Sequence, residues 1–261
     1  MKYFLEDMEV LQRIATADKI ELFLDYDGTI TPIVETPEKA RLLKSTKEIL
    51  QQLSKLPKYQ ITIISGRAID DIRSLVGIAS INYVGNHGYE MMVPGVEIEN
   101  LASPGYYDLL NSLKNEINNK LIDFPGAFIE DKGVTISIHY RQVNPDQAVI
   151  LEHVLYRMTQ PGFESNKIRF NMGKKVFEIR PPLDWDKGKA VEWILEKQNG
   201  FPIYIGDDTT DEDAFFALKD KGITVYVGSQ YREFSCAQYF LNSTDEVIKF
   251  LAYLCEVKND K

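Results

Sequence analysis

The chain has 261 residues, a formal net charge of −9 at pH 7 and 44% hydrophobic residues. This length is enough for one large domain or two modest ones with a buried core. The acidic balance argues against a nucleic-acid-binding protein, because such proteins carry dense clusters of Lys and Arg. An anionic substrate would therefore need a local positive charge, such as a metal ion.

The cysteine count and the apolar pattern narrow the cellular context. Cys236 and Cys255 are too few for a disulfide framework in a chain of this length, which indicates a reducing compartment. The first 18 residues mix acidic and apolar residues and predict an amphipathic helix, not a signal peptide. No uncharged stretch approaches the ~18 residues of a membrane span. We expect a soluble cytoplasmic protein with no membrane partner, and a monomer as the simplest oligomeric state.

The predicted elements at both ends of the chain alternate between strand and helix. The first part reads in the order strand 22–24, helix 38–56, strand 61–64, helix 68–76 and strand 82–84. The last part reads in the order helix 187–198, strand 203–205, helix 211–220, strand 224–227 and helix 245–256. Alternation of this kind predicts a parallel sheet with helices on both faces.

The middle of the chain has a different pattern. Residues 106–122 and 145–158 have helical spacing, whereas residues 134–140 and 175–180 alternate between apolar and polar. Two helices with alternating strands predict a small antiparallel sheet that has one wet face. The sequences Ser103-Pro104-Gly105 and Pro181-Pro182 mark plausible hinges. We therefore predict an α/β fold with a Rossmann-like core, residues 1–104 and 183–261, and an inserted α/β domain with an antiparallel sheet, residues 105–182.

Polar side chains follow three of the core strands. Asp25 and Asp27 end the run ELFLDYD, Ser65 follows ITII, and Asp207 follows IYIG. Lys187 opens the helix before the IYI strand. In open parallel sheets, ligands bind outside the carboxyl ends of the strands. If these strands are neighbours, the side chains converge on one site.

Such a site would bind a divalent cation. The carboxylates of Asp25 and Asp207 would lie close together, and like charges at that distance need a positive partner. Mg²⁺ fits, because it prefers carboxylates, water and phosphate oxygens. Zinc fits less well, because the three histidines, His87, His139 and His153, have no zinc-ligand spacing.

The same residues suit phosphoryl transfer. Asp25 can attack phosphorus and form an aspartyl-phosphate. Asp27 can protonate the departing sugar oxygen and then deprotonate the water that hydrolyses the intermediate. Ser65 and Lys187 would hold the non-bridging oxygens of the phosphate. Gly28 allows the chain to turn sharply after the strand.

Each motif alone also has an ordinary interpretation. DYDG resembles the start of a calcium loop, but Thr29 occupies position five, where an EF-hand has Asp or Asn. The acids from Asp207 to Asp213 are also typical of a helix start. SGR is by itself a common turn, in which Arg67 would orient Asp27 or the turn itself. Together, in this order and each at the end of an element, the motifs favour phosphoryl transfer.

The four motifs resemble those of the haloacid dehalogenase-type phosphatases, with DYDGT as the first, Ser65 the second, Lys187 the third and GDDTTDED the fourth. A narrower resemblance, to the trehalose-6-phosphate phosphatase family, rests on LFLDYDGTITPI, IISGR, VGNHG, HYR, EIRP, DKGKA and GDDTTDEDAF. This resemblance implies a Rossmann-like core, a mobile α/β cap between the second and third motifs, and Mg²⁺-dependent hydrolysis of trehalose 6-phosphate. The predicted inserted domain lies where that cap belongs.

The resemblance also implies a role for each site residue. Asp25 becomes nucleophile and metal ligand, Asp27 the general acid/base and a metal ligand through its carbonyl, and Asp207 the third metal ligand. Asp208 and Asp211 support the metal ligands, and Ser65 and Lys187 bind phosphate. In the cap, the sugar contacts correspond to Glu130, Lys132, Arg141 and Glu178.

The cap assignments and the specificity have alternatives. Glu178 alternates with Phe177 and Ile179, so a solvated strand face would explain it equally well, and His139 fits a surface or hydrogen-bonded histidine. The core motifs cannot distinguish trehalose 6-phosphate from sucrose 6-phosphate or a glucosylglycerol phosphate. Two other classes are a sugar-phosphate-binding module without turnover and a receiver-type phospho-acceptor. The retained Asp25 and Asp207 disfavour the first, and Asp27 with the inserted domain disfavours the second.

Overall fold

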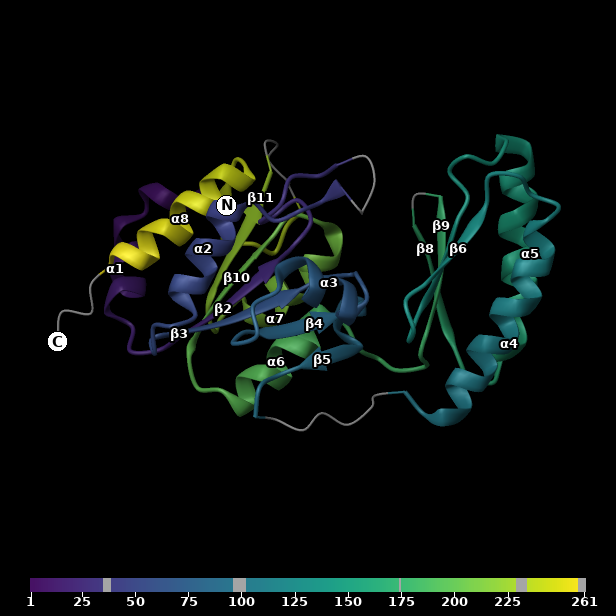
Figure 1. Cartoon of the computed structure of the whole chain (residues 1–261), viewed down its shortest axis with the longest axis horizontal. Helices are drawn as coiled ribbons and strands as arrows, with labels where there is room; N and C mark the ends of the chain where they lie inside the picture. Colours follow the sequence, from purple (N-terminus) through teal and green to yellow (C-terminus); the bar gives the residue numbers. More distant parts are fainter. Residues whose placement is uncertain (35–38, 96–101, 174, 229–233, 258–261) are drawn as a thin grey trace. The chain divides into compact units, whose positions relative to one another are not determined.

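The computed structural model describes residues 1–34, 39–95, 102–173, 175–228 and 234–257. The chain divides into two compact units, one made of Met1–Ile98 with Trp185–Lys261 and the other of Glu99–Asp184 (Figure 1). The predicted inserted segment, residues 105–182, lies within the second unit. Among the described residues, none of the helices has the length and apolar character required to cross a bilayer.

The first unit is built on an eight-stranded sheet in the order β1-β12-β11-β10-β2-β3-β4-β5. Every neighbouring pair is parallel except the antiparallel pair β4 and β5. The strands are β1 (Lys2–Tyr3), β2 (Ile20–Asp25), β3 (Tyr59–Ile64), β4 (Asn82–Gly85), β5 (Glu90–Met92), β10 (Phe201–Gly206), β11 (Ile223–Val227) and β12 (Tyr239–Leu241). The prediction of a mostly parallel α/β fold is confirmed.

Helices cover both faces of this sheet. They are α1 (Met8–Thr16), α2 (Lys44–Leu53), α3 (Ile69–Val76), α6 (Lys187–Lys197), α7 (Glu212–Leu218) and α8 (Thr244–Glu256). Side chains alternate along β2: Leu22 and Leu24 join the core cluster that includes α1, α2, α3 and α8. Phe23 points to the other face and stacks on Tyr204, at 6.4 Å between ring centroids. Tyr204 in turn contacts Phe215 of α7. The two-residue period of a strand therefore buries β2 on both faces.

One predicted helix is too long. The sequence predicts helix from residue 38, but residue 38 lies outside the described residues and α2 begins only at Lys44. The hydroxyl of Tyr26 donates a hydrogen bond of 3.0 Å to the carbonyl of Ala40, and Ala40 is buried. This contact uses the Ala40 carbonyl for tertiary packing and not for a helical hydrogen bond.

The second unit has a four-stranded antiparallel sheet in the order β6-β7-β9-β8. Its strands are β6 (Phe128–Asp131), β7 (Ile136–His139), β8 (Arg169–Gly173) and β9 (Val176–Arg180), and its helices are α4 (Pro104–Leu121) and α5 (Pro145–Glu164). Ile136, Ile138, Phe177 and Ile179 are fully buried, and both helices lie along one side of the sheet (Figure 1). The predicted antiparallel sheet is confirmed.

Candidate active site

The strand register brings three of the predicted site segments to one edge of the parallel sheet. Asp25 pairs with Ile64 on β3, and Leu24 pairs with Ile205 on β10. Ser65 therefore follows β3, and Asp207 follows β10, at the edge where Asp25 ends β2. The three strands β10, β2 and β3 are neighbours in the sheet and lie side by side in Figure 1.

Three carboxylates form a compact cluster at this edge. One oxygen from each of Asp25, Asp207 and Asp211 lies within 4.8 Å of the others. Burial raises the pKa of Asp25 well above its ordinary value, against the opposing effect of Lys187. Burial also raises the pKa of Asp207 to about 7, and the neighbouring charges of Asp211 and Asp208 add to that rise. Burial and the neighbouring acids therefore disfavour the charged forms of Asp25 and Asp207 in the protein alone.

Lys187 connects two members of the cluster. Its Nζ donates 2.7 Å hydrogen bonds to Oδ1 of Asp25 and to Oδ1 of Asp211, and the residue is only 2% exposed. Burial lowers the pKa of this ammonium, but the attraction of Asp211 and Asp25 outweighs burial and raises the pKa above its ordinary value. Lys187 therefore stays charged beside Asp25.

Asp211 organises the loop after β10. Its Oδ1 also accepts a 2.7 Å hydrogen bond from the Tyr204 hydroxyl, and its Oδ2 accepts from the backbone N–H groups of Asp207, at 3.0 Å, and Asp208, at 2.9 Å. A Cβ at Gly206 would lie 2.4 Å from the Asp211 carboxyl carbon. Oδ2 of Asp211 therefore holds the loop after β10, while Oδ1 contacts Lys187 and Tyr204.

Asp208 and Thr29 flank Asp207 in different ways. The Asp208 carboxylate accepts the backbone N–H of Thr209 at 2.6 Å and caps the short 3₁₀ turn Thr209–Asp211. Thr29 donates a 3.4 Å hydrogen bond to Oδ1 of Asp207. Its direct contact with this carboxylate was not predicted, although its place in DYDGT was the available signal. Tyr204 was also missed, because its place in an apolar strand is typical of a core residue.

Gly28 makes room for Asp207. Its φ of +86° lies in the left-handed region, and a Cβ there would lie 2.0 Å from Oδ2 of Asp207. Only glycine satisfies both conditions without displacing the carboxylate. The predicted sharp turn after β2 is thereby also the turn that allows Asp207 to approach.

The Asp27 side chain lies outside the carboxylate cluster. Its two oxygens accept hydrogen bonds from Nε and Nη2 of Arg67, at 2.7 and 2.8 Å. Ser65 is 2% exposed, and its hydroxyl accepts the backbone N–H of Arg67 at 3.2 Å. Arg67, which follows Ser65 in the second motif, therefore fixes the side chain of Asp27 in the first motif.

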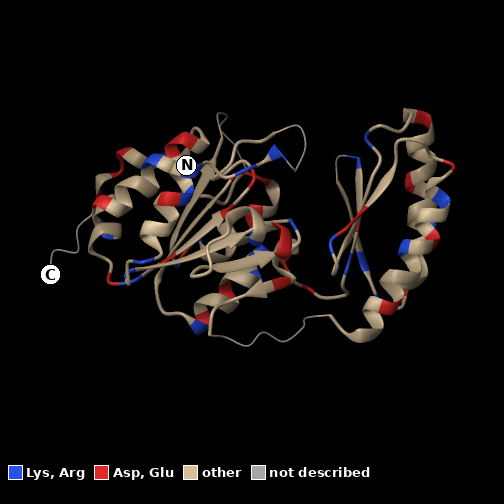
Figure 2. Ribbon diagram, in the orientation of Figure 1, with Lys and Arg blue, Asp and Glu red and all other residues tan. Residues whose placement is uncertain are grey.

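The second unit gathers most of the predicted cap residues on one face of its sheet. Ser137 pairs with Glu130 on one side and with Glu178 on the other. Lys132 Nζ lies 3.8 Å from a carboxylate oxygen of Glu130 and 3.8 Å from one of Glu178. Figure 2 shows charges of both signs on these strands. Glu178 is 7% exposed, so it is not simply a solvated strand residue.

Two further basic residues complete this face, whereas Arg141 does not join it. Arg180 pairs with Glu178, and Nε2 of His139 lies 2.8 Å from Oε2 of Glu130. His139 is thus the hydrogen-bonded histidine that the sequence suggests. Arg141 is exposed in the loop after β7, at the opposite end of the sheet from Lys132.

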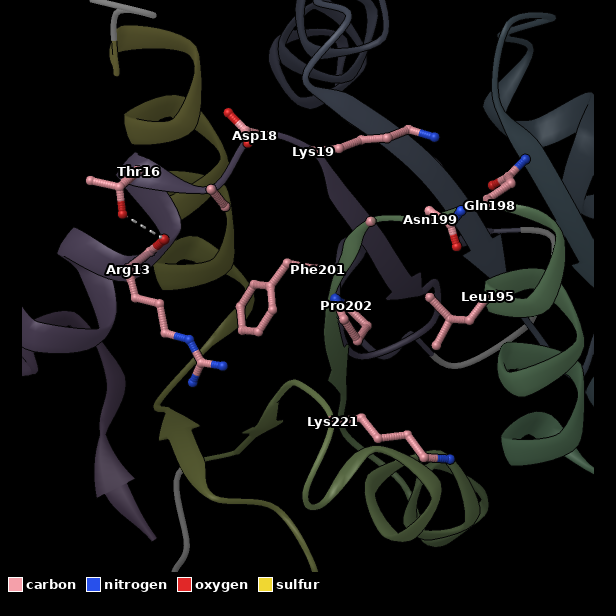
Figure 3. A pocket seen from close by; sticks show the side chains of 12 residues that line it. Arg13, Thr16, Asp18, Lys19, Leu195, Gln198, Asn199, Phe201, Pro202 and Lys221 are labelled. Atoms are coloured by element: carbon pink, nitrogen blue, oxygen red, sulfur yellow. Dashed lines mark hydrogen bonds between the residues drawn. The ribbon is translucent and has the colours of Figure 1, made fainter.

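The opposite edge of the parallel sheet carries a separate pocket of about 710 Å³ (Figure 3). Its lining includes Lys19, which precedes β2, and Phe201, which begins β10. The Arg13 guanidinium stacks on the Phe201 ring, 4.4 Å from its centroid. Lys19 is paired with Glu21 and Lys221 with Glu192. This pocket lies away from the carboxylate cluster, and its lysines already have acidic partners.

Known proteins match both the sequence and the fold. The model of the trehalose-phosphatase family matches residues 23–245. Probable trehalose-phosphate phosphatase I of Arabidopsis thaliana is 35% identical over 273 residues, which cover 97% of this chain and 72% of that protein. The C-terminal domain of a C. albicans trehalose-6-phosphate phosphatase has a TM-score of 0.78 and 26% identity, and the match covers 98% of each chain. An Aspergillus fumigatus trehalose-6-phosphate phosphatase has a TM-score of 0.72 and 26% identity, with 99% of this chain and 100% of that chain covered.

A mostly parallel sheet with acidic residues at its carboxyl edge, joined to a separate antiparallel sheet, defines a phosphatase of the haloacid dehalogenase type. Within this class, the chain belongs to the trehalose-phosphatase family. It is a hydrolase that acts on a phosphoric monoester, and the predicted family and enzyme class are confirmed.

Proposed function

We propose that this enzyme hydrolyses trehalose 6-phosphate to trehalose and phosphate, with Mg²⁺ and through an aspartyl-phosphate on Asp25. The observation that carries the proposal is the buried Asp25 carboxylate, which lies against the Lys187 ammonium and beside Asp207 and Asp211. The Arabidopsis thaliana relative and the C. albicans structure described above are named as phosphatases of trehalose phosphate, which supports the specificity.

Mg²⁺ suits the donors in this cluster. Asp25 and Asp207 offer carboxylate oxygens that lie close together, and a cation between them would offset the cost of holding the like charges there. We propose that these two side chains hold the ion together with the backbone carbonyl of Asp27. Asp208 and Asp211 would support them through the loop that Asp211 fixes. When bound, the ion neutralises phosphate charge and orients the phosphate.

The chain's own residues provide the remaining chemistry. Lys187 Nζ is bonded to one oxygen of Asp25, which leaves the second oxygen for attack on phosphorus. Lys187 and Ser65 lie at the same edge and would bind the non-bridging phosphate oxygens. Asp27 would give a proton to the departing sugar oxygen and later take one from water. Its 40% exposed side chain is accessible for that exchange.

The polar face of the second unit is the proposed sugar site. Glu130, Lys132 and Glu178 form one connected set of carboxylates and ammonium, which can accept from and donate to many hydroxyls. Arg141 would add a contact from the loop after β7. We propose that this unit, residues 105–182, acts as the cap that sets sugar specificity. A cytoplasmic location and a monomeric state remain predictions.

Released phosphate measured over a panel of sugar phosphates, with and without Mg²⁺, tests this proposal. The panel contains trehalose 6-phosphate, sucrose 6-phosphate, glucosylglycerol phosphate and glucose 6-phosphate. We expect trehalose 6-phosphate to have the highest kcat/KM and all turnover to require the ion. Asp25→Asn should reduce turnover by more than about a thousandfold while the thermal transition is retained. Preference for another sugar, or near-normal turnover of Asp25→Asn, would contradict the proposal.

A further inference from the structure

Arg67 and Asp27 form a pair in which the basic partner is the more buried one. The Arg67 side chain is 12% exposed, whereas that of Asp27 is 40% exposed. Two parallel hydrogen bonds join them, Nε to Oδ2 at 2.7 Å and Nη2 to Oδ1 at 2.8 Å. A two-pronged contact of this kind fixes both the position and the plane of the carboxylate. The carboxylate is the group presented to the outside.

Arg67 is itself held from several directions. Its Nη1 donates to Asp71 on α3 at 3.0 Å, and its guanidinium lies 5.6 Å from the centroid of the Tyr26 ring. Its backbone N–H donates to the hydroxyl of Ser65 at 3.2 Å, and its carbonyl accepts the N–H of Asn86 at 2.7 Å. Asn86 has a φ of +48°, in the left-handed region that Asn adopts more readily than most non-glycine residues. These contacts hold both the guanidinium and the backbone of Arg67 in place.

We infer that Arg67 is a positioning residue for proton transfer: it holds the Asp27 carboxylate in the orientation that serves the departing sugar oxygen and then the attacking water. The inference rests on the proposed function, because it assumes the two-step reaction at Asp25. Each carboxylate oxygen has two lone pairs, and the two-pronged contact occupies one on each. The other lone pair of each oxygen stays available for the proton.

The proton follows a defined course through the two steps. In the first, an oxygen of Asp25 forms a bond to phosphorus, and the bond from phosphorus to the sugar oxygen breaks with its electron pair on that oxygen. Protonated Asp27 gives its proton to this oxygen and becomes a carboxylate. In the second, the carboxylate takes a proton from water as the water oxygen bonds to phosphorus. The bond to Asp25 then breaks, which returns Asp25 as a carboxylate, Asp27 in its protonated form and inorganic phosphate.

A comparison of two leaving groups separates positioning from a merely structural role. The alkoxide of trehalose needs a proton to depart, whereas the nitrophenolate of 4-nitrophenyl phosphate does not. In Arg67→Gln, kcat for trehalose 6-phosphate should fall by about a hundredfold, within the usual contribution of general acid–base catalysis. The first turnover of 4-nitrophenyl phosphate should stay close to wild type.

The later turnovers carry a second expectation. Hydrolysis of the aspartyl-phosphate needs Asp27 as base for either substrate, so Arg67→Gln should release a rapid burst of nitrophenolate that approaches the enzyme concentration and then turn over slowly. Trehalose 6-phosphate should give no burst of trehalose. Arg67→Lys keeps the positive charge but can make only one of the two hydrogen bonds to Asp27. Its kcat for trehalose 6-phosphate should therefore fall by about tenfold.

Two controls complete the design. Arg73→Gln removes the same side chain from an exposed position on α3 and should leave both activities unchanged. Guanidinium ion added to Arg67→Ala should restore part of the trehalose 6-phosphate activity, which repair of a structural defect would not explain. Thermal transitions check folding, and Arg67→Lys serves if Arg67→Gln does not fold.

The results separate the inference from the proposed function. If Arg67→Gln or Arg67→Lys slows both substrates equally, without a burst and without rescue, Arg67 does not position Asp27. If the wild-type enzyme turns over neither substrate, or Asp25→Asn remains active, the proposed function itself is wrong. A selective loss with a burst in an enzyme that requires Asp25 supports both.

Discussion

Glu21 is a buried carboxyl group that the proposed chemistry does not use. It lies on β2, is 0% exposed, and neither of its carboxylate oxygens accepts a hydrogen bond from the part of the chain that the structure describes. Lys19 Nζ lies 3.4 Å from Oε1. A Cβ at Gly200 would lie 2.7 Å from Cγ of Glu21, so the backbone closes over the group. Burial raises the pKa of Glu21 from 4.5 to about 7, and the attraction of Lys19 only partly opposes the rise.

This shift makes stability fall as the pH rises. Between pH 4.5 and about 7 the folded protein holds a proton on Glu21 that the unfolded chain has already lost. The stabilising contribution is therefore complete below pH 4.5 and is lost as the pH passes the folded pKa. From about pH 5 to about pH 8, Glu21 alone should lower the free energy of unfolding by about 2.5 kcal/mol. Glu21→Gln cannot ionise, so it should lack this loss.

Urea denaturation of both proteins at about pH 5 and about pH 8 measures the effect. The free energy of unfolding of Glu21→Gln, minus that of wild type, should be about 2.5 kcal/mol larger at about pH 8 than at about pH 5. This holds for any stability difference between the two proteins at about pH 5. Glu196→Gln makes the same change at an exposed position on α6 and should track wild type at both. If Glu21→Gln differs from wild type by an equal amount at both pH values, Glu21 is not a buried group with a raised pKa.

Three further predictions concern the acidic cluster. Gly28→Ala should weaken Mg²⁺ binding by about tenfold or more in calorimetry, because its Cβ would displace the Asp207 carboxylate; unchanged affinity would contradict this. Tyr204→Phe removes a buried hydrogen bond to Asp211 and should lower the free energy of unfolding by about 1 kcal/mol, which thermal melts would detect; an equally stable variant would refute it. Mg²⁺ affinity should rise with pH and level off above about 7, because the proton on Asp207 competes with the ion; a flat profile between about pH 5 and about pH 8 would count against this pKa.

The sequence predicted most of the fold because the strongest elements follow simple periods. Apart from Glu21 and Thr62, the runs ELFL and ITII are apolar, which is typical of strands buried on both faces, and they form β2 and β3. The short edge strands β1 and β5, and the short strand β12 beside β1, were not predicted. Two or three residues are too few to show a period, and their pairing depends on the sheet they join. The start of α2 was wrong because a tertiary contact to Ala40 overrides local helical spacing.

The same limit applies to the site. The sequence placed Asp25, Ser65 and Asp207 at one edge, because strand ends in a parallel sheet share that edge. It could not show that Lys187 bonds both Asp25 and Asp211. Lys187 is separated from Asp25 by 162 positions and from Asp211 by 24, so these side chains meet only in the folded chain. Nor could it separate Glu178 from a solvated strand residue, because alternation places polar residues on a face without saying what covers them.

The charges at the carboxyl edge explain how an acidic chain can bind an anionic substrate. Asp25, Asp27, Asp207 and Asp211 supply four carboxylates, and among the described residues Lys187 and Arg67 are bonded to them as cationic partners. Both cations are already engaged by these acids, so neither alone offers a net positive field to a phosphate. Arg67 is also shared with Asp71, and Asp208 adds a further negative charge beside Asp207, so negative charge is in excess at this edge. A divalent cation would reduce that excess, and its binding would let Lys187 turn toward phosphate oxygens. On this argument, ion and phosphate should each strengthen the binding of the other, since such coupling is reciprocal.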